Sequence, residues 1–323
     1  MALDEFGLIR RYFKASALER EDVALGIGDD CALLRVPADT QLAVSIDSLV
    51  AGVHFLPDVD PETLGHKVLA VNLSDLAAMG AEPAWVTLAL TLPEANLEWL
   101  EAFSRGFSAL AKRHAVQLVG GDTTRGPLSI TIQAHGFLPL GEGLLRSGAR
   151  VGDLVCVTGT LGDAGLALKL SQHGDLETAG SNELRARLEK PEPRLEAGLA
   201  LRGVASAAID ISDGLLADLG HLLDASGVGA TIMLDQLPLS DAVSSALVHD
   251  RDWSIPLASG DDYELCFTLP PSLLGQVQAI GRHLQLPICV IGQIEAMPGL
   301  RCVRENATLW KPSATGFNHF ANE

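Results

Sequence analysis

The sequence is poor in positive charge. It carries 23 Lys and Arg against 41 Asp and Glu, a formal net charge of -18 at pH 7 over 323 residues. Nucleic-acid binding needs clustered cations that neutralise phosphates, and no basic stripe of that kind is present. Nucleic acid is therefore not expected as a partner. Small molecules that carry phosphate stay compatible with the composition if bound cations reverse the local charge.

Paired cysteines and long apolar runs are also missing. No Cys-x-x-Cys pair occurs, and the odd number of scattered cysteines predicts buried thiols in a reducing compartment, with neither a disulfide framework nor a zinc site. The cysteines are Cys31, Cys156, Cys266, Cys289 and Cys302. No apolar run approaches the ~20 residues that span a bilayer, and Met1–Lys14 lacks the pattern of a signal peptide. These absences predict a cytoplasmic protein with no membrane partner.

Several common enzyme signatures are absent as well. The chain has no Gly-x-x-x-x-Gly-Lys-Ser/Thr loop, and the spacing of Gly159, Gly162 and Gly165 does not fit the dinucleotide-binding fingerprint. No Ser lies in a Gly-x-Ser-x-Gly elbow, and no two histidines have the spacing of a zinc hydrolase. If the protein uses ATP, it therefore does so with another architecture.

What the chain does have is aspartate among apolar residues. The turn Gly28-Asp29-Asp30 is flanked by apolar residues, and a carboxylate in such a setting needs a partner that compensates for its desolvation. Similar acids recur at Asp47, Asp75, Asp122, Asp210, Asp213, Asp261 and Asp262. Each could cap a turn or a helix. Alternatively, they could converge on divalent cations, because hard oxygen ligands select Mg²⁺.

Two segments show where such acids would lie. Residues 41–47 alternate in polarity, which predicts a strand with Ser45 and Asp47 on one face and apolar side chains on the other. Residues 61–79 predict a helix whose second half is apolar around most of its circumference. Its Asp75 needs either a structural hydrogen bond or a metal contact.

Strands and helices alternate in both halves of the chain, which predicts an α/β (α+β) protein of two domains. The turn-rich segment 139–143 marks the expected boundary, so the domains are 1–140 and 141–323.

Longer motifs carry a family resemblance over nearly the whole chain. They are Gly28-Asp29-Asp30, the segments 45–55 and 71–81, Gly120-Gly121-Asp122-Thr123, the segments 144–149 and 158–163, Asp210-Ile211-Ser212-Asp213-Gly214-Leu215, Gly260-Asp261-Asp262-Tyr263-Glu264-Leu265 and Gly316-Phe317-Asn318-His319-Phe320. In these motifs the chain resembles the thiamine-monophosphate kinase family, within the superfamily of ATP-dependent enzymes similar to aminoimidazole ribonucleotide synthetase. The resemblance implies an N-terminal α/β domain whose sheet pairs across a homodimer, a C-terminal α+β domain, and an active site in the cleft between them.

The implied reaction is direct transfer of the ATP γ-phosphate to thiamine monophosphate, the last step of thiamine diphosphate biosynthesis. No general base is expected, because the attacking phosphate oxygen is already anionic, and several Mg²⁺ ions would position the phosphates. By resemblance, the Mg²⁺ ligands are Asp30, Ser45, the Ile46 carbonyl, Asp47, Asp75, Asp122, Asp210 and Asp213. The ATP contacts are Gly121, Asp122, Arg146 and Ser212, and the contacts to thiamine monophosphate are His54, Asp261 and Phe317. The first domain would bind ATP and Mg²⁺ and dimerise, and the second would complete the nucleotide and substrate sites.

Within the opening turn, Asp30 is the expected metal ligand and Asp29 shapes the turn or binds through water. Two other hypotheses stay open. One is a sister enzyme of the same superfamily, such as aminoimidazole ribonucleotide synthetase or a selenophosphate-type synthetase. The selenophosphate type needs a reactive N-terminal Cys or selenocysteine, and no Cys precedes Cys31. A non-catalytic metal- or nucleotide-binding protein would have no use for so many costly buried carboxylates.

Overall fold

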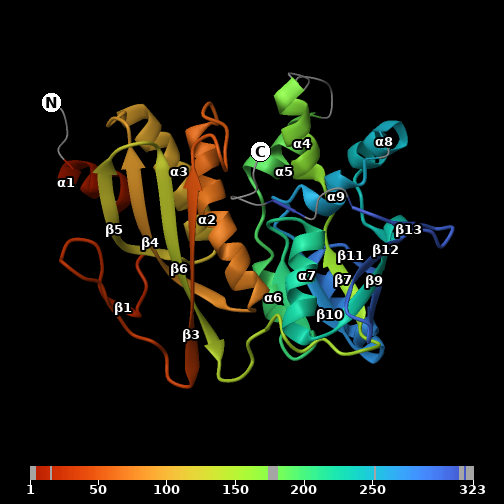
Figure 1. Ribbon diagram of the computed structural model, residues 1–323. Helices are drawn as coiled ribbons and strands as arrows, with labels where there is room; N and C mark the ends of the chain where they lie inside the picture. Colours follow the sequence, from red (N-terminus) through yellow and green to blue (C-terminus); the bar gives the residue numbers. More distant parts are fainter. Residues whose placement is uncertain (1–4, 15–16, 174–180, 251, 313–315, 318–323) are drawn as a thin grey trace. The chain divides into compact units, whose positions relative to one another are not determined.

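The computed structural model describes residues 5–14, 17–173, 181–250, 252–312 and 316–317 (Figure 1). The chain divides into two compact units. The N-terminal unit comprises Met1–Leu76 and Ala81–Gly141, and the C-terminal unit comprises Ala77–Gly80 and Glu142–Glu323. Each unit combines helices with a sheet, so the predicted mixed two-domain architecture is confirmed. The end of one long helix belongs to the C-terminal unit, an exchange that the turn-rich boundary in the sequence does not indicate.

A four-stranded sheet of order β3-β6-β4-β5 forms the N-terminal unit, with β4 and β5 parallel and the other neighbours antiparallel. A small hairpin, β1-β2, accompanies it. The strands are β1 (Val23–Leu25), β2 (Leu33–Leu34), β3 (Thr40–Val50), β4 (Glu82–Leu92), β5 (Gln117–Arg125) and β6 (Ser129–Pro139). The helices are α1 (Glu5–Leu8), the π-helix η1 (Ile9–Lys14), α2 (Pro61–Ala78) and α3 (Leu97–Arg113). In Figure 1, α2 and α3 lie on one face of this sheet.

Helices α2 and α3 cross at two glycines. A side-chain carbon on Gly65 would lie 2.1 Å from the Phe103 carbonyl oxygen, and one on Gly106 would lie 1.8 Å from the Glu62 carbonyl oxygen. Only glycine permits backbones to approach so closely. The crossing holds α2 firmly, with its apolar residues buried as the sequence predicts.

Strand β3 lies at an edge of the sheet. Its polar face is the more buried one, and its apolar face is exposed. Its polar face, with Ser45 and Asp47, is half-buried toward α2. Leu42, Val44 and Ile46 point the other way and are 41%, 52% and 59% exposed. The predicted alternation is therefore present, but in this single chain the apolar face is the uncovered one.

At the opposite edge, β5 is longer than the sequence indicates. The pattern suggests a short strand over 116–119 that runs into a Gly-Gly-Asp-Thr-Thr turn, whereas pairing with β4 continues to Arg125. Gly121 permits this, because a side-chain carbon there would lie 1.9 Å from the carbonyl oxygen of Leu88 on β4.

A seven-stranded sheet of order β13-β12-β9-β11-β7-β10-β8 forms the C-terminal unit. Its strands are β7 (Leu154–Thr158), β8 (Ala207–Asp210), β9 (Gly229–Met233), β10 (Leu265–Leu269), β11 (Ile288–Glu295), β12 (Gly299–Val303) and β13 (Leu309–Trp310). Its α-helices are α4 (Asp163–His173), α5 (Ser181–Glu189), α6 (Leu195–Leu201), α7 (Leu215–Ser226), α8 (Asp241–Asp250), α9 (Ser254–Ala258) and α10 (Leu274–Leu284). Short 3₁₀ turns are η2 (Leu234–Gln236) and η3 (Pro271–Leu273). All neighbouring strands are antiparallel except β12 and β9.

The main core of this unit lies between α7 and the central strands, where Val155, Ile209, Leu219 and Ile232 are buried. Three of the five cysteines are buried, as expected, but Cys31 is exposed and Cys289 is half-buried. The prediction of buried thiols is wrong for Cys31, which follows the exposed residues Asp29 and Asp30 in the segment between β1 and β2.

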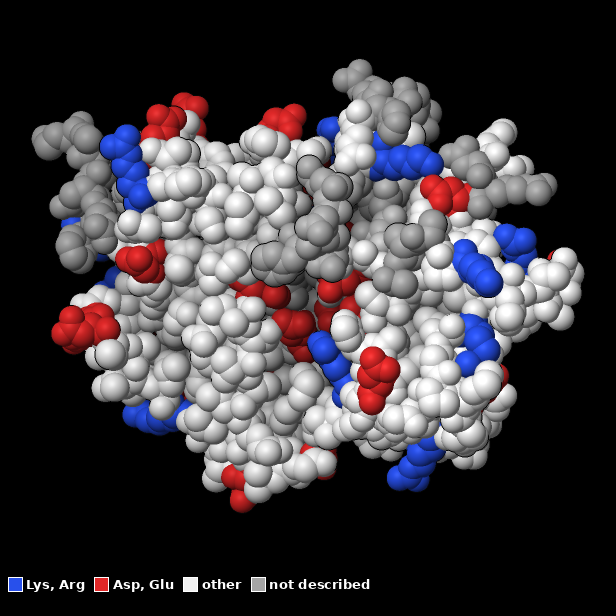
Figure 2. All heavy atoms as spheres, in the orientation of Figure 1, with Lys and Arg blue, Asp and Glu red and all other residues white. Residues whose placement is uncertain are grey.

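Two surface properties bear on partners. Among the described residues, no helix is long and apolar enough to cross a membrane. On the face seen in Figure 2, the coloured Lys and Arg side chains stand apart from one another and form no continuous basic stripe.

Candidate active site

In the N-terminal unit, strand β3 and helix α2 bring three predicted metal-site residues together. The Ser45 hydroxyl donates a hydrogen bond to the Asp75 carboxylate. Two residues further along β3, the backbone N–H of Asp47 donates to the side-chain oxygen of Asn72, 3.2 Å away. Fully buried Asn72 donates in turn to the carbonyl oxygen of Val68 on its own helix, which fixes its orientation. Ser45, Asp47 and Asp75 therefore share one polar patch, and Asn72 aligns the strand with the helix.

The two acids of the Gly-Asp-Asp turn differ in their contacts. The Asp29 carboxylate accepts the backbone N–H of Asp30 at 2.9 Å, an interaction that shapes the turn. Asp30 is exposed. The tertiary structure also adds a cation that the local sequence lacks, since the Lys14 ammonium lies 2.8 Å from where a side-chain carbon on Gly28 would be.

Asp122 and Gly121 lie away from this patch, on the opposite edge strand. Asp47 pairs with Ile132, Ile132 with Leu88, and Leu88 with Gly121. Three strand spacings therefore separate Asp47 from Gly121, about 14 Å in a flat sheet. Asp122 is in register with Ser48, so it also points to the other face of the sheet.

In the C-terminal unit, two hydrogen-bonded loops collect the remaining predicted acids and the aromatic residue. Asp210 ends β8 next to the loop 211–214, and the segment 260–264 lies against that loop. The Asp261 N–H donates to the Ser212 carbonyl at 2.8 Å, and the Phe317 N–H donates to the Asp213 carbonyl at 3.0 Å. Proposed nucleotide, metal and substrate residues are therefore neighbours here, although they come from distant parts of the sequence.

Asp218 holds one of these loops and was not singled out from the sequence. One oxygen of its buried carboxylate accepts the backbone N–H groups of Ser212, Asp213 and Gly214, at 3.0, 3.1 and 3.1 Å. Burial and the nearby Asp213 charge raise the pKa of Asp218 to about 7, and the three N–H groups oppose that shift. An acid in the first turn of a helix that follows Ser-Asp-Gly is the sequence signal that could have indicated it.

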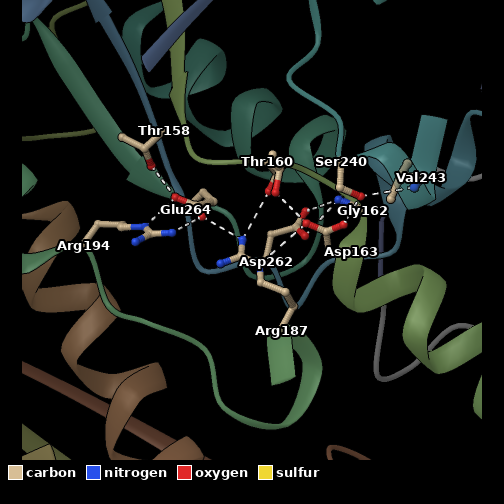
Figure 3. A network of polar contacts seen from close by, with 10 residues as sticks. All are labelled: Thr158, Thr160, Gly162, Asp163, Arg187, Arg194, Ser240, Val243, Asp262 and Glu264. Carbon is tan, nitrogen blue, oxygen red and sulfur yellow. Dashed lines mark hydrogen bonds and ion pairs between the residues drawn. The ribbon is translucent and has the colours of Figure 1, made fainter. Parts of the chain in front are cut away.

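A second missed feature is a buried ionic network in the same unit (Figure 3). Glu264 is fully buried and accepts hydrogen bonds from Thr158, Arg187 and Arg194. Close by, Asp262 accepts the Gly162 N–H with both carboxylate oxygens. The two arginines lie 70 and 77 residues from Glu264 along the chain, which is why no local pattern reveals the network.

Burial and neighbouring charges shift the pKa values of two residues in this network. Burial raises the pKa of Asp262 well above its usual value, and the Gly162 N–H and Arg187 only partly oppose the shift. Burial by itself would lower the pKa of Arg187, but Glu264, Asp262 and Asp163 outweigh it and raise that pKa. Arg187 is therefore a permanent cation between these acids.

The two other predicted contacts lie in turns. His54 is half-buried, and its Nδ1 accepts the backbone N–H of Val50 at 3.0 Å, which leaves Nε2 as the N–H of a neutral ring. Arg146 is exposed in a turn whose carbonyl accepts the Ser226 hydroxyl. The same hydroxyl accepts the N–H groups of Gly148 and Ala149, so the turn is held at the end of α7.

Comparisons with known proteins identify the family. The family model "AIR synthase related protein, N-terminal domain" matches residues 28–138, and "AIR synthase related protein, C-terminal domain" matches residues 150–304. The thiamine-monophosphate kinase of Salmonella typhimurium is 51% identical over 327 aligned positions, which cover 99% of each chain. The chain belongs to the thiamine-monophosphate kinase family.

Solved structures agree with this membership. The crystal structure of thiamine-monophosphate kinase from Stenotrophomonas maltophilia K279a is 50% identical, covers 94% of this chain and 97% of its own, and has a TM-score of 0.87. A structure described as AaThiL complexed with AMPPCP and TMP is 32% identical, covers 98% and 97% of the two chains, and has a TM-score of 0.77. The mixed helix-and-sheet fold of two domains is thus confirmed.

The proposed metal ligands suit Mg²⁺ by their chemistry, because all are carboxylate, hydroxyl or carbonyl oxygens. Among the described residues, no three His, Cys, Asp or Glu side chains already converge on one point. The set is instead distributed between the Gly28–Asp30 turn, the Ser45–Asp47–Asp75 patch, the far edge at Asp122, and the loops of the C-terminal unit.

Proposed function

We propose that this protein transfers the γ-phosphate of ATP directly to the phosphate of thiamine monophosphate, which yields ADP and thiamine diphosphate. The observation that carries the proposal is the likeness over 98% of the chain to a structure described as complexed with AMPPCP and TMP. The full-length identity of 51% to a thiamine-monophosphate kinase supports the same reaction.

Magnesium belongs to the proposal. The ligands would be Asp30, Ser45, the Ile46 carbonyl, Asp47, Asp75, Asp122, Asp210 and Asp213. When bound, Mg²⁺ would neutralise the phosphates and position them for in-line transfer. The oxygen donors of the Ser45–Asp47–Asp75 patch support this assignment.

The protein's own groups would bind and orient the reactants. Gly121, Asp122, Arg146 and Ser212 would contact ATP, and an exposed arginine such as Arg146 can make a forked contact to phosphate. An already ionised phosphate oxygen is the nucleophile, so no side chain need remove a proton. Catalysis then depends on positioning and on charge neutralisation.

Thiamine monophosphate carries a cationic thiazolium ring, and its proposed contacts suit that charge. Phe317 is 47% exposed, and its ring could stack on the cation. Asp261 would add a negative charge beside it, and the Nε2–H of His54 could donate to a substrate oxygen.

A homodimer is the proposed assembly. Strand β3 is an edge strand with three exposed apolar residues, a surface that a second copy could cover. In the same proposal, residues 1–140 bind ATP and Mg²⁺ and form the dimer contacts. Residues 141–323 complete the nucleotide and substrate sites. The cytoplasmic location and the absence of nucleic-acid and membrane partners stay predictions.

One assay tests the function. Purified protein is incubated with ATP, Mg²⁺ and thiamine monophosphate, with other phosphorylated acceptors in parallel, and both ADP and thiamine diphosphate are measured. We expect equal amounts of ADP and thiamine diphosphate with thiamine monophosphate, and no turnover of the other acceptors. Faster turnover of another acceptor than of thiamine monophosphate would contradict the proposal.

A further inference from the structure

The segment Gly260–Glu264 has an unusual backbone. Asp261 and Tyr263 have φ of +64° and +50°, the left-handed region that side-chain-bearing residues rarely adopt. Both side chains are half-buried, whereas the alternate residues Asp262 and Glu264 are 5% and 0% exposed. The segment therefore presents every second side chain outward and anchors the others inside the unit.

Glu264 is anchored on two sides. Arg194 donates through Nε and one terminal nitrogen to the two carboxylate oxygens, at 2.7 and 2.5 Å, which is a forked contact. Arg187 donates to one of these oxygens at 2.8 Å and Thr158 to the other at 2.7 Å. Figure 3 shows all three side chains directed at the carboxylate.

Asp262 is anchored by a different loop. Its two oxygens accept the Gly162 N–H at 3.0 and 3.2 Å. Arg187 connects this loop to Glu264, since it also donates to the Thr160 carbonyl at 3.3 Å and lies 3.7 Å from the Asp163 carboxylate. The glycine-rich motif 158–163, which no step of the proposed reaction uses, is thus the support of the segment 260–264.

The same segment touches the proposed binding loops. Tyr263 donates its N–H to the Ile211 carbonyl, and the Ile211 N–H donates to the Glu264 carbonyl, each at 2.8 Å. Asp261 lies between the anchored residues and the Ser212 loop. A buried ion pair adds little net stability, because desolvation offsets much of the attraction, so its expected role here is to hold the segment 260–264 in one conformation.

We propose that Asp262 and Glu264, held by Gly162, Arg187 and Arg194, are positioning residues that keep the Asp261 carboxylate in place for the thiazolium cation of thiamine monophosphate. This inference rests on the proposed function and extends it to five residues that do not contact substrate. Loss of an anchor lets the left-handed segment relax, which moves Asp261 away from the substrate.

The test separates substrate positioning from general stability. Arg194→Lys keeps the charge but loses the forked contact, and Asp262→Ala loses the acceptor that Asp262→Asn retains. We expect Arg194→Lys and Asp262→Ala to raise the KM for thiamine monophosphate by about tenfold or more. The KM for ATP should stay near the wild-type value, and Asp262→Asn should recover most of the loss.

The matched control is Glu295→Gln, which breaks a 2.8 Å ion pair with Arg301 elsewhere in the same unit and should leave both KM values unchanged. Melting temperatures are recorded for every variant. Equal rises in both KM values, or lower melting temperatures with unchanged KM values, would overturn the positioning role. Wild-type protein that fails to phosphorylate thiamine monophosphate would instead count against the proposed function itself.

Discussion

The Ser45 hydroxyl donates to the Asp75 carboxylate and thereby joins strand β3 to helix α2 across 30 residues of sequence. If this patch binds Mg²⁺, Asp75→Asn and Asp47→Asn should each lower kcat/KM by about 100-fold or more, because an amide cannot replace the anionic ligand. The melting temperature should stay close to that of the wild type. Asp58→Asn, at an exposed site, is the control. Activity near the wild-type level in Asp47→Asn would exclude its metal role.

The two acids of the Gly28–Asp30 turn should differ in their effect on activity. Asp29→Asn retains an oxygen that can accept the Asp30 N–H, so the turn is preserved and activity should fall only slightly. Asp30→Asn should cause the larger loss and should raise the Mg²⁺ concentration needed for half-maximal rate. Titration of activity with Mg²⁺ measures both, and equal losses would refute this division of roles.

Asp218 should matter for the stability of the Ser212–Gly214 loop. Asp218→Ala leaves three backbone N–H groups without their acceptor, and we expect unfolding free energy to fall by about 3 kcal/mol. Asp218→Asn provides an uncharged acceptor and should recover much of that loss. Urea denaturation measures both variants. If the Asp218→Ala and Asp218→Asn variants are equally destabilised, the hydrogen-bonding role of the Asp218 oxygen is contradicted.

Asp262 should make stability depend on pH. Its pKa is raised by burial, so its contribution to stability is complete below the usual carboxyl range and is lost as pH rises through the folded-state pKa. Asp262→Asn carries no charge at any pH. The stability of this variant relative to wild type should therefore improve as pH rises from about 4 to 8. Denaturation curves across that range test the sign, and a difference that runs the other way would contradict it.

The exposed apolar face of β3 should control assembly. Val44→Glu places a charge on that face and should reduce the mass in sedimentation equilibrium from dimer to monomer, with loss of activity if the second copy completes the site. Val248→Glu is the matched control, because Val248 is 76% exposed on α8 in the other unit. A wild-type protein that sediments as a monomer would contradict the dimer.

Periodicity predicted the elements that depend on local pattern. The helix over 61–79 and the alternation around Ser45 and Asp47 are both present, because helix and strand periods can be counted from the chain itself. The continuation of β5 through Gly120 and Gly121 was missed, since it depends on a pairing partner in β4 that local sequence does not reveal.

The residues of the candidate site were also predicted only in part. Asp30, Asp47 and Asp75 could be selected from the sequence as acids among apolar residues, and the family motifs supplied their proposed roles. Asp122 shows the limit of that reasoning. It stands out in the sequence like the others, yet the sheet order puts it on the far edge and the other face.

By itself, the sequence determined the family, the mixed two-domain architecture and the reaction to expect, because these follow from motifs and periods written along the chain. Only the tertiary structure decided which charges meet. Glu264 finds its arginines 70 and 77 residues away, and Asp218 holds a loop that begins six residues before it. Such partners are selected by the burial of a charge, which demands compensation from whatever side chain or N–H group the fold brings near.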